Sequence, residues 1–173
     1  MGRRRLVPML LACTFASGAG AQSAGGARTN YWSDPFVNVT SALPACPVPA
    51  GPLITAEQAL AESHARSQRG VSCYLSGRCR LANSYLYDKE IVPRVRQFIL
   101  ADGRFESSSI WVLGQRRAVW LMGCVASEAD RQTLEALVRN IDDVEAVINE
   151  LMVGTGGQPA YEVAAPLDSA VRR

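Results

Sequence analysis

Two short apolar runs on either side of Arg116-Arg117 constrain the fold of this chain more than any other feature. Residues 110–115 and 118–125 are rich in β-branched and aromatic side chains, and only two residues separate them. This spacing is typical of a tight β-hairpin. An isolated hairpin is marginal in water, so the flanking segments are expected to pack against its apolar surface.

The flanking segments predict two helices and a further strand. Residues 88–101 form the first helix, with Asp88 as its cap and Asp102-Gly103 at its end. Ser127, with Asp130 three residues later, caps the second helix. The apolar stripes at helical spacing are Ile91, Val95, Phe98 and Ile99 on the first helix and Leu134, Leu137, Val138 and Ile141 on the second. With a strand over 144–153, the element order indicates a small α+β sandwich.

The N-terminus has the features of an export signal. A basic start, an apolar run over residues 6–15 and the small residues Ala19-Gly20-Ala21 predict a signal peptide over 1–21. A second interpretation stays open, because Leu10-Leu11-Ala12-Cys13 resembles a lipoprotein box in which Cys13 is lipidated. Either route predicts a periplasmic protein, membrane-anchored in the second case. No apolar run approaches the roughly 20 residues of a transmembrane helix.

Three further segments complete the predicted organisation. Residues 22–54 are rich in proline and are expected to form an extended arm packed on the rest of the protein. Residues 55–83 comprise a helix that begins with a Thr55/Gln58 capping box and stops at Gly70, followed by an irregular segment. Residues 154–173 are predicted to be a disordered tail.

Four cysteines remain after the leader, which favours disulfides in an oxidising compartment. The absence of a CxxC pair from the sequence argues against zinc. Of the three possible pairings we favour Cys73–Cys79, which needs only a local turn, together with Cys46–Cys124, which would tie the arm to the hairpin.

Charge and composition restrict the function. The chain carries 18 basic and 16 acidic residues, and the leader holds three of the arginines, so 15 basic groups remain. A near-neutral chain is a poor candidate for nucleic-acid binding. The single histidine, His64, has no candidate nucleophile paired with it in the sequence. We therefore expect no enzymatic activity, no cofactor and no metal site.

Residues 84–153 resemble a BON domain, the module of bacterial osmotic-shock and nodulation proteins. The resemblance rests on the helix over 88–102 and on two strand motifs, Val119-x-Leu121-x-Gly123-x-Val125 and Val144-x-x-Val147-x-Asn149-x-Leu151-x-Val153. It implies an α-β-β-α-β sandwich with a three-stranded mixed sheet and two helices on one face. It also implies a non-enzymatic module that binds phospholipid membranes or envelope proteins. The family hairpin commonly turns through Asn-Gly, whereas this chain has Arg116-Arg117.

Strand alternation identifies the candidate binding surface. With a two-residue turn, Leu113 faces Trp120 and Trp111 faces Met122 on one face of the sheet, and Cys124 continues that face. The opposite face, towards the helices, carries Ile110, Val112, Val119, Leu121 and Val125. This first face is too apolar to lie against water, and there are three candidates for what covers it: the arm, a second copy of the chain, or lipid.

The sequence therefore predicts a cell-envelope binding module that contacts a phospholipid surface or an envelope protein through the Trp/Arg hairpin. Its candidate residues are Arg116, Arg117, Trp111, Trp120, Leu113 and Met122. The alternative is a lipoprotein adaptor anchored through Cys13 that binds a protein partner rather than lipid. The oligomeric state stays open.

Overall fold

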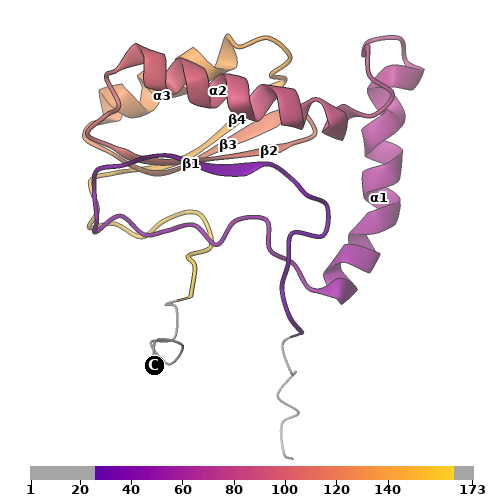
Figure 1. Ribbon diagram of the computed structural model, residues 1–173, viewed down its shortest axis with the longest axis horizontal. Helices are drawn as coiled ribbons and strands as arrows, with labels where there is room; N and C mark the ends of the chain where they lie inside the picture. Colours follow the sequence, from indigo (N-terminus) through magenta and orange to yellow (C-terminus); the bar gives the residue numbers. More distant parts are fainter. Residues whose placement is uncertain (1–25, 166–173) are drawn as a thin grey trace, which may run out of the picture.

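The computed structural model describes residues 26–165, so the predicted signal peptide and Cys13 lie outside the described residues. The fold is α+β, as predicted: a four-stranded mixed sheet with helices (Figure 1). In chain order the elements are β1 (Phe36–Ser41), α1 (Ala56–Leu75), the 3₁₀-helix η1 (Ser84–Leu86), α2 (Asp88–Asp102), β2 (Ser109–Gln115), β3 (Ala118–Val125), α3 (Glu128–Arg139) and β4 (Ala146–Val153).

The sheet has the order β1-β2-β3-β4, one strand more than the three predicted. β1 and β3 are antiparallel to β2, while β4 runs parallel to β3 after the crossover through α3. The additional strand comes from the arm, where residues 36–43 are free of proline and can therefore donate to a ladder. Phe36 pairs with Leu113, and the register shifts between Asn38 and Thr40.

The main core lies between the sheet and the pair α2 and α3, which cover one face (Figure 1). The five strand residues predicted to face the helices are all fully buried, as are Leu134 and Val138 of α3. On α2 the predicted stripe is wrong at Phe98, which is 48% exposed. Val92 is buried instead, because Gly114 leaves room for it: a Cβ at Gly114 would lie 2.6 Å from Val92 Cγ2.

Helix α1 begins as predicted but does not end at Gly70. Thr55 and Gln58 form the capping box, and the helix continues to Leu75, where Ser76 follows as the C-cap. Gly70 is buried inside the helix, and a Cβ there would lie 2.6 Å from the side-chain amide of Asn83. The glycine therefore permits close approach of the segment before η1 rather than terminating the helix.

The arm and the segment after β4 lie side by side across the sheet face opposite α2 and α3 (Figure 1). Ala50 N–H donates to Glu162 O at 2.8 Å, and Ala164 N–H donates to Val48 O at 2.8 Å. Tyr161 is buried, and its hydroxyl donates to Pro47 O at 2.8 Å. Residues 154–165 thus differ from the expected disordered tail, because Tyr161 supplies the apolar anchor that the glycines around it lack.

Candidate functional site

The β2–β3 hairpin has the predicted register and turn length. Leu113 pairs with Trp120, Trp111 with Met122, and Gln115 with Ala118, so Arg116 and Arg117 alone form the turn. Their φ angles are 53° and 65°, which makes this a type I′ turn built without glycine or asparagine. Residues other than glycine rarely adopt these φ angles, so contacts with the surrounding structure have to hold the turn in place.

The carboxylate of Asp88 provides that support. Its Oδ2 accepts a hydrogen bond from Arg116 N–H at 2.6 Å, and its Oδ1 accepts one from Arg117 N–H at 2.8 Å. Asp88 is fully buried, and burial raises its pKa from 3.8 to about 6, against the lowering effect of the two hydrogen bonds. The nearby Asp34 carboxylate raises the same pKa further, while Arg66 lowers it.

The predicted role of Asp88 as a helix cap is therefore wrong. Tyr87 occupies the N-cap position of α2 and makes no side-chain capping bond, whereas Asp88 is the first residue inside the helix. An acidic residue fits the sequence pattern of a helix start whether it is the N-cap or the first residue inside the helix. Its contact with the hairpin 28 residues later depends on tertiary packing, which the local pattern does not record.

The two arginines of the turn have different surroundings. The Arg117 guanidinium donates from Nε to Asp143 O at 2.9 Å and from Nη1 to Cys79 Sγ at 3.4 Å, and lies 5.0 Å from the centre of the Tyr87 ring. Arg116 is exposed and forms no ion pair within residues 26–165. Of the predicted pair, only Arg116 presents its charge to solvent.

The apolar face of the hairpin is covered mainly by the arm and the segment after β4. Tyr161 packs on Leu113 and Met122, which are 8% and 5% exposed, while Trp111 and Trp120 are half-buried. Leu43 and Cys46 of the arm pack with Trp111 and Cys124. Of the three candidates for covering this face, the structure has the chain's own arm there, together with residues 154–165.

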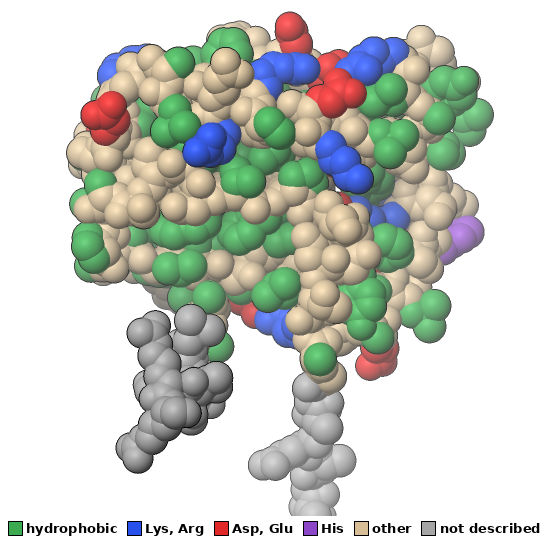
Figure 2. Space-filling model, viewed as in Figure 1, with side chains coloured by type: hydrophobic (Ala, Val, Ile, Leu, Met, Phe, Trp, Pro, Cys, Tyr) green, Lys and Arg blue, Asp and Glu red, His purple; other side chains and the backbone are tan. Residues whose placement is uncertain are grey.

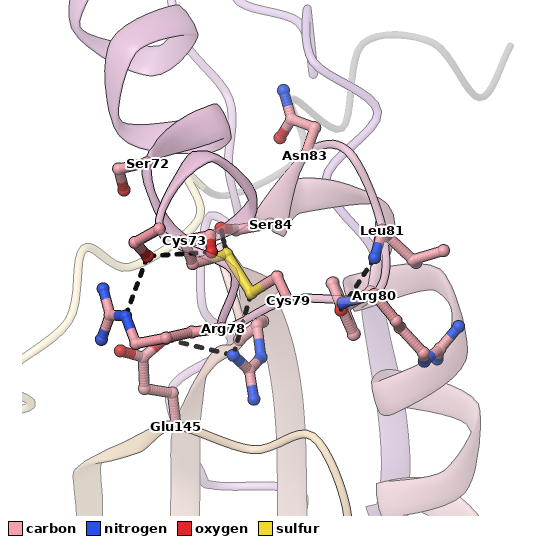
Figure 3. The surroundings of a disulfide bond; sticks show 12 residues. Ser72, Cys73, Arg78, Cys79, Arg80, Leu81, Asn83, Ser84 and Glu145 are labelled. Atoms are coloured by element: carbon pink, nitrogen blue, oxygen red, sulfur yellow. Dashed lines mark hydrogen bonds and ion pairs between the residues drawn. A yellow bond between two sulfur atoms is a disulfide. The ribbon is translucent and has the colours of Figure 1, made fainter.

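Both favoured disulfides are present. Cys46–Cys124 joins the arm to β3 with a Cα–Cα distance of 5.9 Å, and Cys73–Cys79 closes the loop after α1 with a Cα–Cα distance of 5.3 Å. Figure 3 shows the second bond beside Ser84, whose hydroxyl lies 3.0 Å from Cys73 Sγ. This disulfide therefore fixes the end of α1 next to η1 and the hairpin.

A polar cluster ties the arm to α1 and to the hairpin. Asp34 of the arm is buried and accepts two hydrogen bonds from Arg66 of α1, at 2.6 and 3.0 Å. The side-chain amide of Gln115, the last residue of β2, donates to Asp34 at 2.6 Å. None of these three residues stands out in the sequence, since each looks like an ordinary surface residue until the three elements meet.

Cationic side chains without ion pairs occur around the hairpin end of the molecule. Within residues 26–165, Arg69 near the Gln115 end of β2, Arg78 in the disulfide loop and Lys89 beside Asp88 are exposed and form no ion pair, like Arg116. Figure 2 shows that on the viewed face the charged side chains lie mainly over the helical half, whereas hydrophobic ones gather over β1 and the arm.

The comparisons with known proteins agree with this geometry. A model of the BON domain family matches residues 87–155, from the residue before α2 to just beyond β4. BON domains are non-catalytic binding modules, generally associated with phospholipid or envelope binding. The search of curated proteins finds no match to this chain.

The family match and the disulfides bear on localisation. BON-domain proteins are usually associated with the cell envelope, and the two disulfides favour a location outside the cytoplasm.

Across residues 26–165, no helix is both long and apolar enough to cross a bilayer. The same residues contain no group of three or more potential metal ligands.

Proposed function

We propose that this protein is a non-enzymatic binding module of the cell envelope whose hairpin tip contacts the anionic surface of a phospholipid membrane. The observation that supports it best is the placement of Arg116. The buried Asp88 holds the turn from below, so the Arg116 side chain extends into solvent at the tip of the hairpin. A guanidinium presented in this way fits the phosphate groups of a membrane surface.

The proposal assigns different roles to the six candidate residues. Arg116 makes the contact, and Arg117 braces the turn through Asp143 and Cys79. The remaining four residues, which the arm and Tyr161 partly cover, keep the hairpin rigid: Trp111, Leu113, Trp120 and Met122. Membrane affinity then rests on charge rather than on insertion of tryptophan.

The size of the effect follows from the number of free cations. Each Lys or Arg near an anionic surface contributes about 1 kcal/mol. If Arg116 and Lys89 both reach the surface, binding gains about 2 kcal/mol, roughly thirtyfold. Such binding is reversible and weakens as salt screens the charges.

Co-flotation with vesicles tests this function. Oxidised protein comprising residues 22–173 is mixed with phosphatidylglycerol-containing or purely zwitterionic vesicles at low and moderate salt. We expect salt-sensitive flotation with the anionic vesicles only, reduced several-fold by Arg116→Glu. The matched control is Arg96→Glu, an exposed arginine of α2 without an ion pair in the described structure. Equal loss in both variants would indicate a non-specific charge effect, and no flotation would refute direct lipid contact.

A lipoprotein adaptor anchored through Cys13 is the second candidate. The observation that favours it is the engagement of Arg117 by Glu145 and by Asp143 O, which leaves the hairpin one free guanidinium and little affinity for a membrane. An acyl anchor would then supply the attachment while the folded part binds a protein. A globomycin-sensitive mass increase on the mature protein, without vesicle binding by residues 22–173, is the result expected for the adaptor.

The non-enzymatic part of the proposal rests on the side chains themselves. His64 is exposed on α1 and has no side-chain hydrogen bond within residues 26–165, so it is not oriented as a general base. The four cysteines of that region are all in disulfides, so none offers a thiol nucleophile.

A further inference from the structure

The junction of the arm, α1 and the hairpin encloses a hollow that the membrane proposal does not use. Its volume is about 340 Å³, at the lower end of the range of roughly 300–1,000 Å³ for small-molecule sites. Trp32 and Asp34 of the arm, Arg66 and Arg69 of α1, Tyr85 of η1 and Gln115 of β2 line it. A second hollow, of about 280 Å³, adjoins it across Trp32, Arg66 and Tyr85.

The polar wall of this hollow is rigid. Arg66 is fixed to the buried Asp34 by two hydrogen bonds, and Gln115 donates to the same carboxylate. Asn30 in turn fixes Asp34, because its side chain accepts from Asp34 N–H at 3.0 Å and donates to Asp34 O at 2.8 Å. Groups held in this way lose little conformational entropy when a ligand binds.

The aromatic wall is partly open to solvent. The Arg66 guanidinium lies between two rings, 4.9 Å from the centre of Trp32 and 3.9 Å from the centre of Tyr85. This arrangement uses one face of each ring, yet Trp32 remains 36% exposed. A partly exposed indole that belongs to none of the hydrophobic core clusters and lies next to a hollow is the kind of platform that binding sites use.

The charges lining the hollow balance. Arg66 is neutralised by Asp34, and the remaining charged groups are Arg69 and Glu62, one of each sign. An anion would gain one uncompensated guanidinium and meet a carboxylate, so the lining favours a neutral ligand with many hydroxyl or amide groups. The ring faces carry partial negative charge and attract the weakly positive C–H groups of such a ligand.

A sugar ring combines these properties, since it has a C–H face and a rim of hydroxyls. We propose that this hollow binds a neutral saccharide. Trp32 stacks on the C–H face of the ring, while Gln115 and Arg69 form hydrogen bonds with its hydroxyl or amide groups. Most of the lining comes from the arm and α1, which lie outside the segment that matches the BON family.

The test is binding of oxidised residues 22–173 to a panel of neutral glycans, including chitotetraose, maltotetraose and cellotetraose. Isothermal titration calorimetry gives the affinity for each glycan of the panel that the protein binds. We expect saturable binding to at least one, weakened about tenfold by Trp32→Ala and several-fold by Arg69→Ala. Tyr31→Ala is the matched control, because Tyr31 is a neighbouring aromatic, 45% exposed, that does not line the hollow.

Three results would overturn the proposal: no saturable binding across the panel, binding that neither variant weakens, or displacement of the glycan by inorganic phosphate. Circular dichroism and thermal unfolding of each variant separate a lost contact from a lost fold. Arg116→Glu should keep full glycan affinity while its vesicle binding falls several-fold. The saccharide site and the membrane contact therefore stand or fall separately.

Discussion

The carboxylate of Asp88 lies 2.6 Å from the backbone nitrogen of Arg116, so the first residue of α2 holds a turn formed 28 residues later. The hairpin tip and the helix are consequently one rigid unit. Most type I′ turns reach positive φ by means of glycine or asparagine; this one places two arginines there and satisfies their N–H groups with a buried carboxylate.

Removal of that carboxylate should release the turn. Asp88→Ala leaves two N–H groups at the tip without their acceptor and creates a small void beneath the hairpin. We expect the free energy of unfolding to fall by about 2 kcal/mol or more, measured by urea titration. Asp102→Ala is the control, since that half-buried carboxylate at the other end of α2 pairs only with Arg104. Equal losses in the two variants would contradict the role given to Asp88.

The raised pKa of Asp88 predicts a pH dependence of stability. The folded state binds this proton more tightly than the unfolded chain, because the pKa is about 6 rather than 3.8. The stabilisation is therefore complete below about pH 4 and is lost as the pH rises through 6. It amounts to about 3 kcal/mol.

Asp88→Asn removes the titrating group and allows the contribution of Asp88 to be isolated. The difference in unfolding free energy between the wild type and this variant should change by most of that amount between pH 4 and pH 7. Carboxyl groups distant from Asp88 do not sense the substitution, so their contributions cancel in the difference. A difference that stays constant over this range would show that Asp88 has an ordinary pKa in the folded protein.

Gly123 is predicted to be the least replaceable residue of β3. Its φ is 117°, and a Cβ there would lie 2.0 Å from the carbonyl oxygen of Ser109. Gly123→Ala should therefore destabilise the protein by about 3 kcal/mol or more, through both backbone strain and displacement of β2. Gly156→Ala, at a position with open space around it, should change thermal stability little. Similar melting temperatures for the two variants would refute this explanation.

The two disulfides should differ in their effect on stability. Cys46–Cys124 closes a loop of 78 residues and Cys73–Cys79 a loop of six. Loop-closure entropy gives contributions of about 4 and about 2 kcal/mol. Denaturant unfolding of Cys46→Ala/Cys124→Ala and of Cys73→Ala/Cys79→Ala measures them. The reverse ranking would mean that the short loop stabilises α1 and η1 beyond chain entropy.

The sequence predicted the hairpin, the register and the two helices that cover it, because these depend on residues near one another in the chain. The alternation of Trp111 and Leu113 with Val112 assigns the two faces of β2 without reference to any other segment. The capping box at Thr55 is equally local, with both of its bonds within four residues.

The rest depended on contacts between distant segments. β1 is a strand because β2 offers an edge to it, and the pattern of the arm alone reads as an irregular, proline-rich segment. Gly70 resembles a helix stop in sequence, and only the position of Asn83 shows why it is a glycine. The saccharide-binding hollow is the extreme case, since its walls come from four separate segments of the chain.

The disulfide pairing also has a consequence for biosynthesis. The bonds are nested: the loop closed by Cys73–Cys79 lies inside the one closed by Cys46–Cys124. A chain that emerges N-terminus first presents Cys46, Cys73 and Cys79 together, well before Cys124 arrives. An early bond from Cys46 to Cys73 or Cys79 has to be exchanged before the native pairing forms, so catalysis of thiol–disulfide exchange, and not oxidation alone, should speed the maturation of this protein.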